Sequence, residues 1–209
     1  MLRSEGLQFS YPSGTSLTLP DVSLEVGEQA LILGPSGSGK STLLGLWSGL
    51  LSPKQGSVII GNTSVHALKG SARDHWRASH VGIVYQRPRL IESQSVFNNI
   101  ALQSKLSGKR IDRAAILKQM EGLSIAHLAD RYPAECSVGE QQRVGILRAL
   151  VHEPQLILAD EPTSALDSKN ALTVAELLQQ QAKLRGATLA VVTHDDRLRP
   201  LFSRTVELN

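Results

Sequence analysis

A glycine-rich segment between a predicted strand and a predicted helix constrains the fold of this chain more than any other feature. An apolar run at residues 30–33 precedes it, and a helical pattern follows, with Leu43, Trp47, Leu50 and Leu51 on one face. Glycines let backbone N–H groups surround a phosphate without Cβ clashes, and the N-terminus of the helix adds a positive dipole. The residues of this phosphate loop are Gly34, Pro35, Ser36, Gly37, Ser38, Gly39, Lys40, Ser41 and Thr42.

Two side chains of the phosphate loop suit the chemistry of a triphosphate. Lys40 is placed to reach the β- and γ-phosphates, and the hydroxyl of Ser41 is placed to bind Mg²⁺. A Gly/Ser-rich turn that arose by chance would need neither the strand before it nor the helix after it. The loop in this setting therefore predicts a site for a nucleoside triphosphate.

Length and composition limit the remaining possibilities. A chain of 209 residues, 41% hydrophobic and 20% charged, is typical of one globular domain, and a net charge of +3 indicates neither nucleic acid nor lipid. Cys136 is the only cysteine, so no internal disulfide forms and a reducing, cytoplasmic setting is expected. The N-terminus lacks the apolar core of a signal peptide, and no apolar run approaches the ~20 residues that span a bilayer. Action at a membrane would therefore need a second polypeptide.

Two kinds of strand pattern divide the chain. Runs of alternating polarity predict antiparallel strands with one exposed face at 7–11, 17–19, 22–26 and 57–60. Unbroken apolar runs predict the buried strands of a mostly parallel sheet at 81–84, 156–159 and 188–192. A last strand is expected at 205–208.

Helical patterns fill much of the remaining sequence. Residues 90–152 contain several helical stretches, including 114–120 and 141–151, and a further helix is expected at 170–184. The apolar stripe of that last helix consists of Leu172, Ala175, Leu178 and Ala182. Together the patterns predict a single domain over residues 1–209, with an α/β core, an antiparallel β-subdomain and an inserted α-helical subdomain at about 90–152.

Two carboxylates end one of the buried strands. Asp160 and Glu161 follow the apolar run at 156–159, and ligands of open α/β sheets bind at the carboxyl ends of strands. Asp160 is therefore expected to hold Mg²⁺, directly or through water, and Glu161 to polarise an attacking water. Taken alone, an apolar run followed by Asp-Glu is weak evidence for a site, because many strands end in charged residues that simply face solvent. Combined with the phosphate loop, it indicates a hydrolytic site.

Further short motifs follow one another in a fixed order. Residues 136–143 read Cys-Ser-Val-Gly-Glu-Gln-Gln-Arg, residues 164–167 read Ser-Ala-Leu-Asp, Gln86 ends a predicted strand, His194 follows Val-Val-Thr, and Tyr11 lies in Phe-Ser-Tyr-Pro. Alone, each would more often be a structural or surface feature. With the phosphate loop and the carboxylate pair, their order and spacing resemble the ATP-binding subunits of ABC transporters over nearly the whole chain.

The resemblance implies ATP, bound with Mg²⁺ between two subunits of a homodimer with the P-loop NTPase core of the ABC ATPase fold. In that family the residues equivalent to Ser137 and Gly139 contact the γ-phosphate held by the other subunit, and Asp167 belongs to a loop that crosses the interface. The family's usual Leu and first Gly are here Cys136 and Val138. A helix that begins at this point would accept Val138 in right-handed backbone.

The resemblance also assigns roles outside the dimer interface. Gln86 is implied to contact Mg²⁺ or the attacking water and to relay to the membrane subunit, His194 to contact the γ-phosphate, and Tyr11 to stack on adenine. The implied metal ligands are Ser41, Gln86 and Asp160. The implied catalytic residues are Glu161, His194 and Gln86.

The function implied is ATP hydrolysis that powers a membrane ABC transporter through separate transmembrane permease subunits, at the cytoplasmic face of the cell (inner) membrane. Residues 139–144 and 158–162 are similar to the lipoprotein-release, macrolide-efflux and cell-division ATPases (LolD, MacB and FtsE), which favours an exporter or release complex. Residues 163–167 look more like amino-acid importers. Import of a small solute therefore stays open, as does a mechanotransmission ATPase that drives a membrane partner without transport.

Soluble ABC-type ATPases of DNA repair form another class. They insert a coiled coil or a DNA-binding module between the phosphate loop and the segment equivalent to Ser137. The interval from Lys40 to Ser137 leaves no room for such an insertion. No nucleic-acid partner is therefore expected.

The segment from Gln86 to about Asn99 is expected to form a groove for a cytoplasmic helix of the membrane subunit. Leu90, Ile91, Val96 and Phe97 would be its apolar anchors. In the alternative, these side chains fill the core of the helical subdomain, and for Val96 and Phe97 both possibilities stay open.

Overall fold

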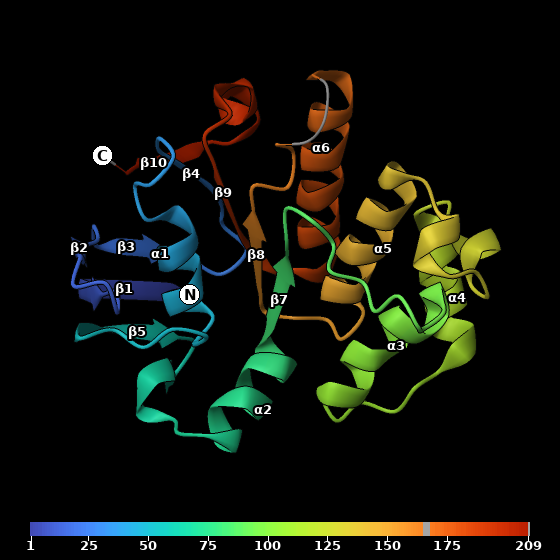
Figure 1. Cartoon of the computed structure of the whole chain (residues 1–209), viewed down its shortest axis with the longest axis horizontal. Coiled ribbons are helices and arrows are strands. Elements are labelled where there is room, and N and C mark those ends of the chain that lie inside the picture. Colours follow the sequence, from blue (N-terminus) through green and yellow to red (C-terminus); the bar gives the residue numbers. More distant parts are fainter. Residues whose placement is uncertain (165–167, 209) are drawn as a thin grey trace.

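A parallel sheet of five strands occupies the centre of the molecule (Figure 1). The structure is a computed structural model that describes residues 1–164 and 168–208. The strands lie in the order β10-β4-β9-β8-β7, and each neighbouring pair is parallel. Their bounds are β4 Gln29–Leu33, β7 Val81–Val84, β8 Leu156–Asp160, β9 Thr188–Thr193 and β10 Arg204–Glu207. Leu33 pairs with Thr193 and Asp160 with Val192, so β4, β8 and β9 end at the same edge.

An antiparallel sheet packs beside the parallel one. Its strands are β1 Leu2–Ser10, β2 Ser16–Thr18, β3 Val22–Leu24, β5 Gln55–Ile60 and β6 Thr63–Ser64. The order is β2-β1-β5-β6, with β3 also paired to β1. Buried and exposed side chains alternate along β3, and buried and half-buried side chains alternate at the end of β5, as the sequence pattern predicted. The predicted α/β class with one parallel and one antiparallel sheet is confirmed.

Six α-helices connect the strands of the described chain. Their bounds are α1 Lys40–Trp47, α2 Ser71–His80, α3 Val96–Leu106, α4 Arg113–Gly122, α5 Val138–Leu150 and α6 Ser168–Arg185. The short 3₁₀ turns are η1 Val65–Ala67, η2 Ala126–Leu128, η3 Pro133–Glu135 and η4 Asp196–Leu201. Helix α2 was not predicted, because Trp76 is its only buried residue and so no apolar stripe marks it.

Two predicted helical stripes need correction. Helix α1 ends at Trp47, and Leu50 beyond it is 48% exposed, because Gly49 takes a left-handed φ of 71° that ends the helix. On α6 the buried stripe begins at Ala171, whereas Leu172 is 37% exposed. The buried positions of α6 are Ala171, Ala175, Leu178 and Ala182. The error was of one residue at the start of the stripe.

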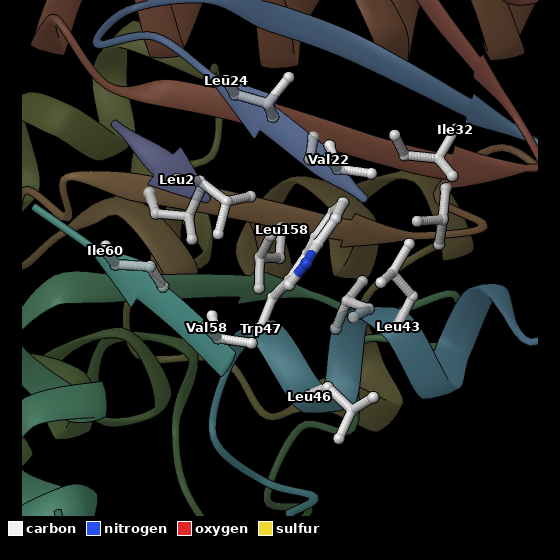
Figure 2. Close-up of a cluster of buried hydrophobic side chains, with 14 of the residues drawn as sticks. Leu2, Val22, Leu24, Ile32, Leu43, Leu46, Trp47, Val58, Ile60 and Leu158 are labelled. Carbon is white, nitrogen blue, oxygen red and sulfur yellow. The ribbon is translucent and has the colours of Figure 1, made fainter. Parts of the chain in front are cut away.

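Helix α1 is held between the two sheets. Trp47 is fully buried among side chains of both, including Leu2 and Val58 of the antiparallel sheet and Leu158 of the parallel sheet (Figure 2). The opposite face of the parallel sheet packs against α5 and α6. The parallel strands are thus covered on both faces, which explains their unbroken apolar sequences.

The helices from α3 to α5 form a separate apolar cluster, away from the antiparallel sheet (Figure 1). Val96 is fully buried and Phe97 is 6% exposed within this cluster, and Leu90 packs against it. Of the proposed anchors, only Ile91, at 40%, is exposed. Of the two possibilities for Val96 and Phe97, the structure therefore favours the second, because both side chains fill the core of the helical part.

His152 follows α5 and is fully buried. Burial lowers its pKa from the ordinary 6.5 to about 4, because the charged imidazolium loses its water. The backbone of Val81 opposes the shift, while Lys109 and His80 add to it and Glu153 counters it. The side chain is therefore neutral in the folded chain near pH 7.

This buried histidine predicts a loss of stability in mild acid. The unfolded chain takes up the proton near pH 6.5 and the folded chain only near pH 4. The free energy of unfolding is therefore highest above pH 6.5 and falls as the pH is lowered from 6.5 to 4, because protonation then favours the unfolded chain. The loss should reach about 3 kcal/mol in the free energy of unfolding. Urea unfolding at pH 7.5 and 4.0 measures it, with His152→Leu as the variant that cannot titrate. Equal pH dependence in both proteins would contradict the assignment.

Candidate nucleotide site

The phosphate loop has the predicted strand, turn and helix geometry. Strand β4 ends at Leu33 and α1 begins at Lys40, with Gly37 and Gly39 between them at φ 85° and 95°. A Cβ at Gly34 would lie 2.6 Å from both the Leu208 carbonyl oxygen and Ser38 Oγ, so only glycine fits there. The loop therefore opens directly onto the N-terminus of a helix, the arrangement that binds phosphate.

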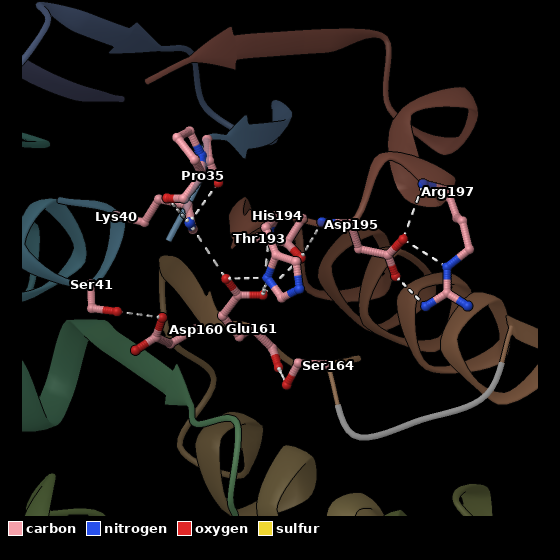
Figure 3. A network of polar contacts seen from close by, with 11 residues as sticks. Pro35, Lys40, Ser41, Asp160, Glu161, Ser164, Thr193, His194, Asp195 and Arg197 are labelled. Atoms are coloured by element: carbon pink, nitrogen blue, oxygen red, sulfur yellow. Dashed lines mark hydrogen bonds and ion pairs between the residues drawn. The ribbon is translucent and has the colours of Figure 1, made fainter. Parts of the chain in front are cut away.

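Lys40 lies against the loop that it belongs to. Its Nζ donates to the carbonyl oxygens of Gly34 and Pro35 at 2.7 and 2.8 Å, and the side chain is 6% exposed. The same Nζ lies 3.6 Å from the carboxylate of Glu161 (Figure 3). The ammonium group thus links the phosphate loop to the end of β8.

Ser41 and Asp160 form a pair of oxygen donors at the edge of the sheet. Ser41 Oγ donates to Asp160 Oδ1 at 3.0 Å (Figure 3). Burial raises the pKa of the Asp160 carboxyl, while the hydrogen bond from Ser41 partly opposes the rise. A hydroxyl and a carboxylate side by side are the ligand types that suit Mg²⁺ bound together with phosphates.

Glu161 has the most constrained position in the site. Its φ is 47°, which is unfavourable for a residue other than glycine, and its N–H donates to the Val192 carbonyl at 2.9 Å. The carboxylate accepts from Thr193 Oγ1 at 3.0 Å and contacts His194 Nδ1 at 2.9 Å. Strained residues with functional side chains are typical of active sites. The bend directs the carboxylate toward Lys40.

A second layer of polar contacts orders the loop that carries His194. The N–H of Asp195 donates to Thr193 Oγ1 at 3.0 Å, and the Asp195 carboxylate pairs with Arg197 at 2.7 Å (Figure 3). The hydrogen bond from Arg197 is the main cause of the lowered pKa of Asp195. Sequence reasoning missed the roles of Thr193 and Asp195. Their polarity at the end of β9 was the available signal.

Tyr11 joins the site from the antiparallel sheet. Its hydroxyl hydrogen-bonds Thr42 Oγ1, and its ring meets that of Phe9 edge-on at 5.0 Å between centroids. The ring remains 37% exposed. A pocket of about 250 Å³ is lined by Tyr11, Ser36, Gly37, Gly39, Lys40, Ser41, Thr42 and Glu161. Residues far apart in the sequence are therefore brought together around the phosphate loop.

The other predicted site residues lie outside this pocket. Ser137 caps α5, where its Oγ accepts from the N–H of Glu140 at 3.4 Å and the Glu140 carboxylate accepts from the Ser137 N–H at 2.8 Å. Val138 is the first residue of α5 in right-handed backbone and is 70% exposed beside Gly139. Gln86 is exposed in a bend beyond the end of β7, rather than at the end of the strand itself. Asp167 lies outside the described residues.

Known proteins of similar sequence and fold decide the family of this chain. Residues 17–164 match the protein-family model described as ABC transporter. The chain belongs to the ABC transporter family. It is 42% identical over 184 residues to the ABC transporter ATP-binding protein YtrE of Bacillus subtilis, covering 86% of this chain and 80% of YtrE. It is 41% identical over 193 residues to the putative ABC transporter ATP-binding protein MG467 of Mycoplasma genitalium, covering 91% of this chain but only 62% of that protein.

Solved ABC cassettes share the whole fold. The dimeric cassette MJ0796, in a post-hydrolysis state bound to ADP and Pi, superposes with a TM-score of 0.87 at 31% identity, covering 100% of this chain and 94% of that one. The protein cbiO1 of Clostridium perfringens, part of the ABC transporter complex cbiONQ, superposes with a TM-score of 0.87 at 28% identity. The match covers 100% of this chain and 84% of cbiO1.

These comparisons establish the coarse function. The chain is an ABC ATPase that binds and hydrolyses ATP, and it is the ATP-binding subunit of a membrane transport complex. The predictions of the family, the ABC ATPase fold and the ATPase activity are confirmed. Across the described ranges 1–164 and 168–208, none of the helices has the length and apolarity needed to cross a bilayer.

Proposed function

We propose that this ABC ATPase powers an exporter or a lipoprotein-release or efflux complex. Two copies would act as a homodimer on separate transmembrane permease subunits, at the cytoplasmic face of the cell (inner) membrane. The observation that carries the direction is the similarity of residues 139–144 and 158–162 to the release, efflux and cell-division branch. We further propose that residues 1–209 are one cassette whose helical subdomain spans about 90–152, in keeping with the separate apolar cluster of α3, α4 and α5.

The proposed site binds ATP with Mg²⁺. Ser41, Asp160 and Gln86 would hold the ion, which supplies positive charge that polarises the phosphates. The hydrogen-bonded oxygens of Ser41 and Asp160 suit a hard cation. Among the described residues no group of three or more His, Cys, Asp or Glu could hold a metal by itself. An ion held mainly by nucleotide phosphates, with few protein ligands, fits both observations.

The proposed chemistry uses residues of both subunits. Glu161 would act as the general base toward water, and His194, held by the Glu161 carboxylate, would contact the γ-phosphate. Ser137 and Gly139 of the second copy would close over the same phosphate, and Asp167 would contribute from the interface. The start of α5 is exposed and does not line the pocket of its own chain, which supports completion by a second copy.

A second cavity offers a place for the membrane partner. It measures about 500 Å³ and lies between α2, β7 and α3. Exposed Ile91 and Leu106 give it apolar lining, and Arg89 adds positive charge, whereas Arg77 pairs with Asp74 of the same lining at 2.6 Å. An amphipathic helix of the permease would place apolar side chains into such a groove.

Capture of the membrane subunit tests this proposal. Affinity-tagged chain is expressed in its own cells, and detergent-extracted partners are identified by mass spectrometry. The wild type should capture a permease, and Ile91→Asp should not. Ile111→Asp is the control, because Ile111 is similarly exposed, at 43%, but lies outside the cavity, and this variant should still capture the permease. ATP binding by each variant reports whether it is folded. Absence of any membrane protein, or equal capture by both variants, would contradict the proposal.

The identity of the captured proteins decides between the alternatives. A permease with a large extracytoplasmic domain supports export or release. A solute-binding protein in the complex supports import, which the similarity of residues 163–167 to amino-acid importers favours. A membrane partner that moves no substrate in vesicles supports a mechanotransmission ATPase.

Recognition of the base makes a separate prediction about Tyr11. Stacking on adenine contributes about 1–3 kcal/mol, so Tyr11→Ala should weaken ATP binding by about tenfold or more. Tyr11→Phe keeps the ring and loses only the hydrogen bond to Thr42, so its affinity should stay within about threefold. Titration calorimetry with ATP and GTP measures both, and Tyr132→Ala, an exposed tyrosine outside the pocket, is the matched control. Equal affinities for all four proteins would show that Tyr11 does not stack.

A further inference from the structure

Helix α5 contacts the Gln86 segment, residues 85–91, at two neighbouring points. At Gly145 a Cβ would lie 2.8 Å from Pro88 Cβ, so the helix approaches the segment as closely as glycine allows. One turn further, Arg148 Nη1 donates to the Arg89 carbonyl at 2.9 Å and Nη2 donates to the Pro88 carbonyl. The two terminal nitrogens of the planar guanidinium each donate to one of these carbonyls, a fixed spacing of donors that a single ammonium nitrogen does not have.

The backbone that Arg148 holds is unusual. Arg89 has a φ of 48°, a left-handed conformation that side chains other than glycine rarely adopt. Its own guanidinium stacks over the Tyr85 ring at 4.6 Å from the centroid. Burial lowers the pKa of the Arg148 guanidinium, because the charged form loses water, while Tyr85 opposes the shift. Among the described residues, the hydrogen bonds of this half-buried guanidinium go to the backbone of this turn, which indicates that the turn must keep its shape.

We propose that Arg148 is a positioning residue that fixes the Gln86 segment to α5. The helix carries Ser137 at its N-terminus, so the segment and the proposed γ-phosphate contact of the second subunit would move as one body. Gln142 of the same helix donates to the Pro162 carbonyl at 3.2 Å, just beyond Glu161. A rotation of α5 would therefore shift both loops that face the nucleotide.

The contact between Arg148 and the Gln86 segment lies at the cavity proposed for the membrane partner. Tyr85, Arg89 and Arg148 all line it. A helix that enters the cavity would press on the Arg148 contacts, and through them on Gln86. The inference rests on the proposed roles of Gln86 and Ser137 but needs no particular membrane partner.

A double-mutant cycle on the isolated chain tests whether Arg148 acts through Gln86. Arg148→Met keeps the aliphatic stem and removes both hydrogen bonds, so kcat should fall by about 10-fold to 100-fold through misplacement of Gln86, with KM for ATP changed less than about twofold. In a Gln86→Ala background the same substitution should lower kcat by less than about twofold. Arg148→Lys, which can reach one carbonyl, should restore part of the lost rate.

A purely structural arginine would behave differently. It would lower kcat by the same factor in both backgrounds, and that result would overturn the proposal, as would a Gln86→Ala variant with wild-type turnover. Arg113→Met, an exposed arginine of α4 that pairs with Asp130, is the matched control and should leave kcat unchanged. Thermal unfolding identifies variants that fail to fold, and Arg148→Lys keeps the test valid if Arg148→Met is one of them. Because no permease is present, failure of the capture experiment would leave this result standing.

Discussion

Replacing Glu161 with glutamine is expected to stop most ATP turnover while leaving ATP binding intact. A general base contributes about 10²–10⁴-fold to a rate, so kcat should fall by about that factor. The amide fits the same contacts. Its oxygen can accept from Thr193 Oγ1 and the His194 N–H, and its NH₂ can donate to His194 Nδ1 in the other tautomer. The ability to take a proton from water is lost, together with the negative charge that lies 3.6 Å from Lys40 Nζ.

The accompanying measurement is the oligomeric state. An ATP-bound Glu161→Gln chain should accumulate as a dimer in gel filtration, because the nucleotide that joins the subunits is no longer hydrolysed. Glu121→Gln, at an exposed position of α4, should behave as the wild type in both assays. Wild-type turnover by Glu161→Gln would show that another group activates the water.

Features that depend on neighbouring residues were predictable from the sequence. The phosphate loop and the two kinds of strand each follow from short patterns of glycine or apolar spacing. Helix α2 was missed because its single buried residue, Trp76, leaves no periodic signal. The stripe of α6 was displaced because Leu172 is apolar yet exposed.

The site required contacts between distant segments that no local pattern shows. Thr193 and Asp195 hold Glu161 and the His194 loop, but polar residues are common at the ends of strands, so their polarity alone does not identify this role. The left-handed backbone of Glu161 was equally hidden, because its residue type does not favour that conformation. Arg148 was overlooked since its partners are backbone carbonyls, which have no sequence signature.

Removal of the Lys40 side chain is expected to cause the largest loss of nucleotide affinity. Hydrogen bonds to charged groups contribute about 1.5–3 kcal/mol each, so losing contacts to two phosphates should weaken ATP binding by about 100-fold or more in Lys40→Ala. The loss should be smaller for ADP and absent for AMP, because fewer phosphates remain within reach of the ammonium group. A general collapse of the loop would instead weaken the binding of ATP, ADP and AMP alike.

Lys40→Arg sharpens the same test. The ammonium lies within 2.8 Å of two loop carbonyls in a side chain that is 6% exposed, so a guanidinium does not fit and the variant should bind ATP little better than Lys40→Ala. Lys118→Ala on the exposed face of α4 is the control, with wild-type affinity expected. Titration calorimetry measures the affinities, and the thermal unfolding midpoint of each variant shows that the fold is kept. Wild-type ATP affinity in Lys40→Ala would mean that backbone N–H groups of the loop, rather than Lys40, provide the compensating charge for the phosphates.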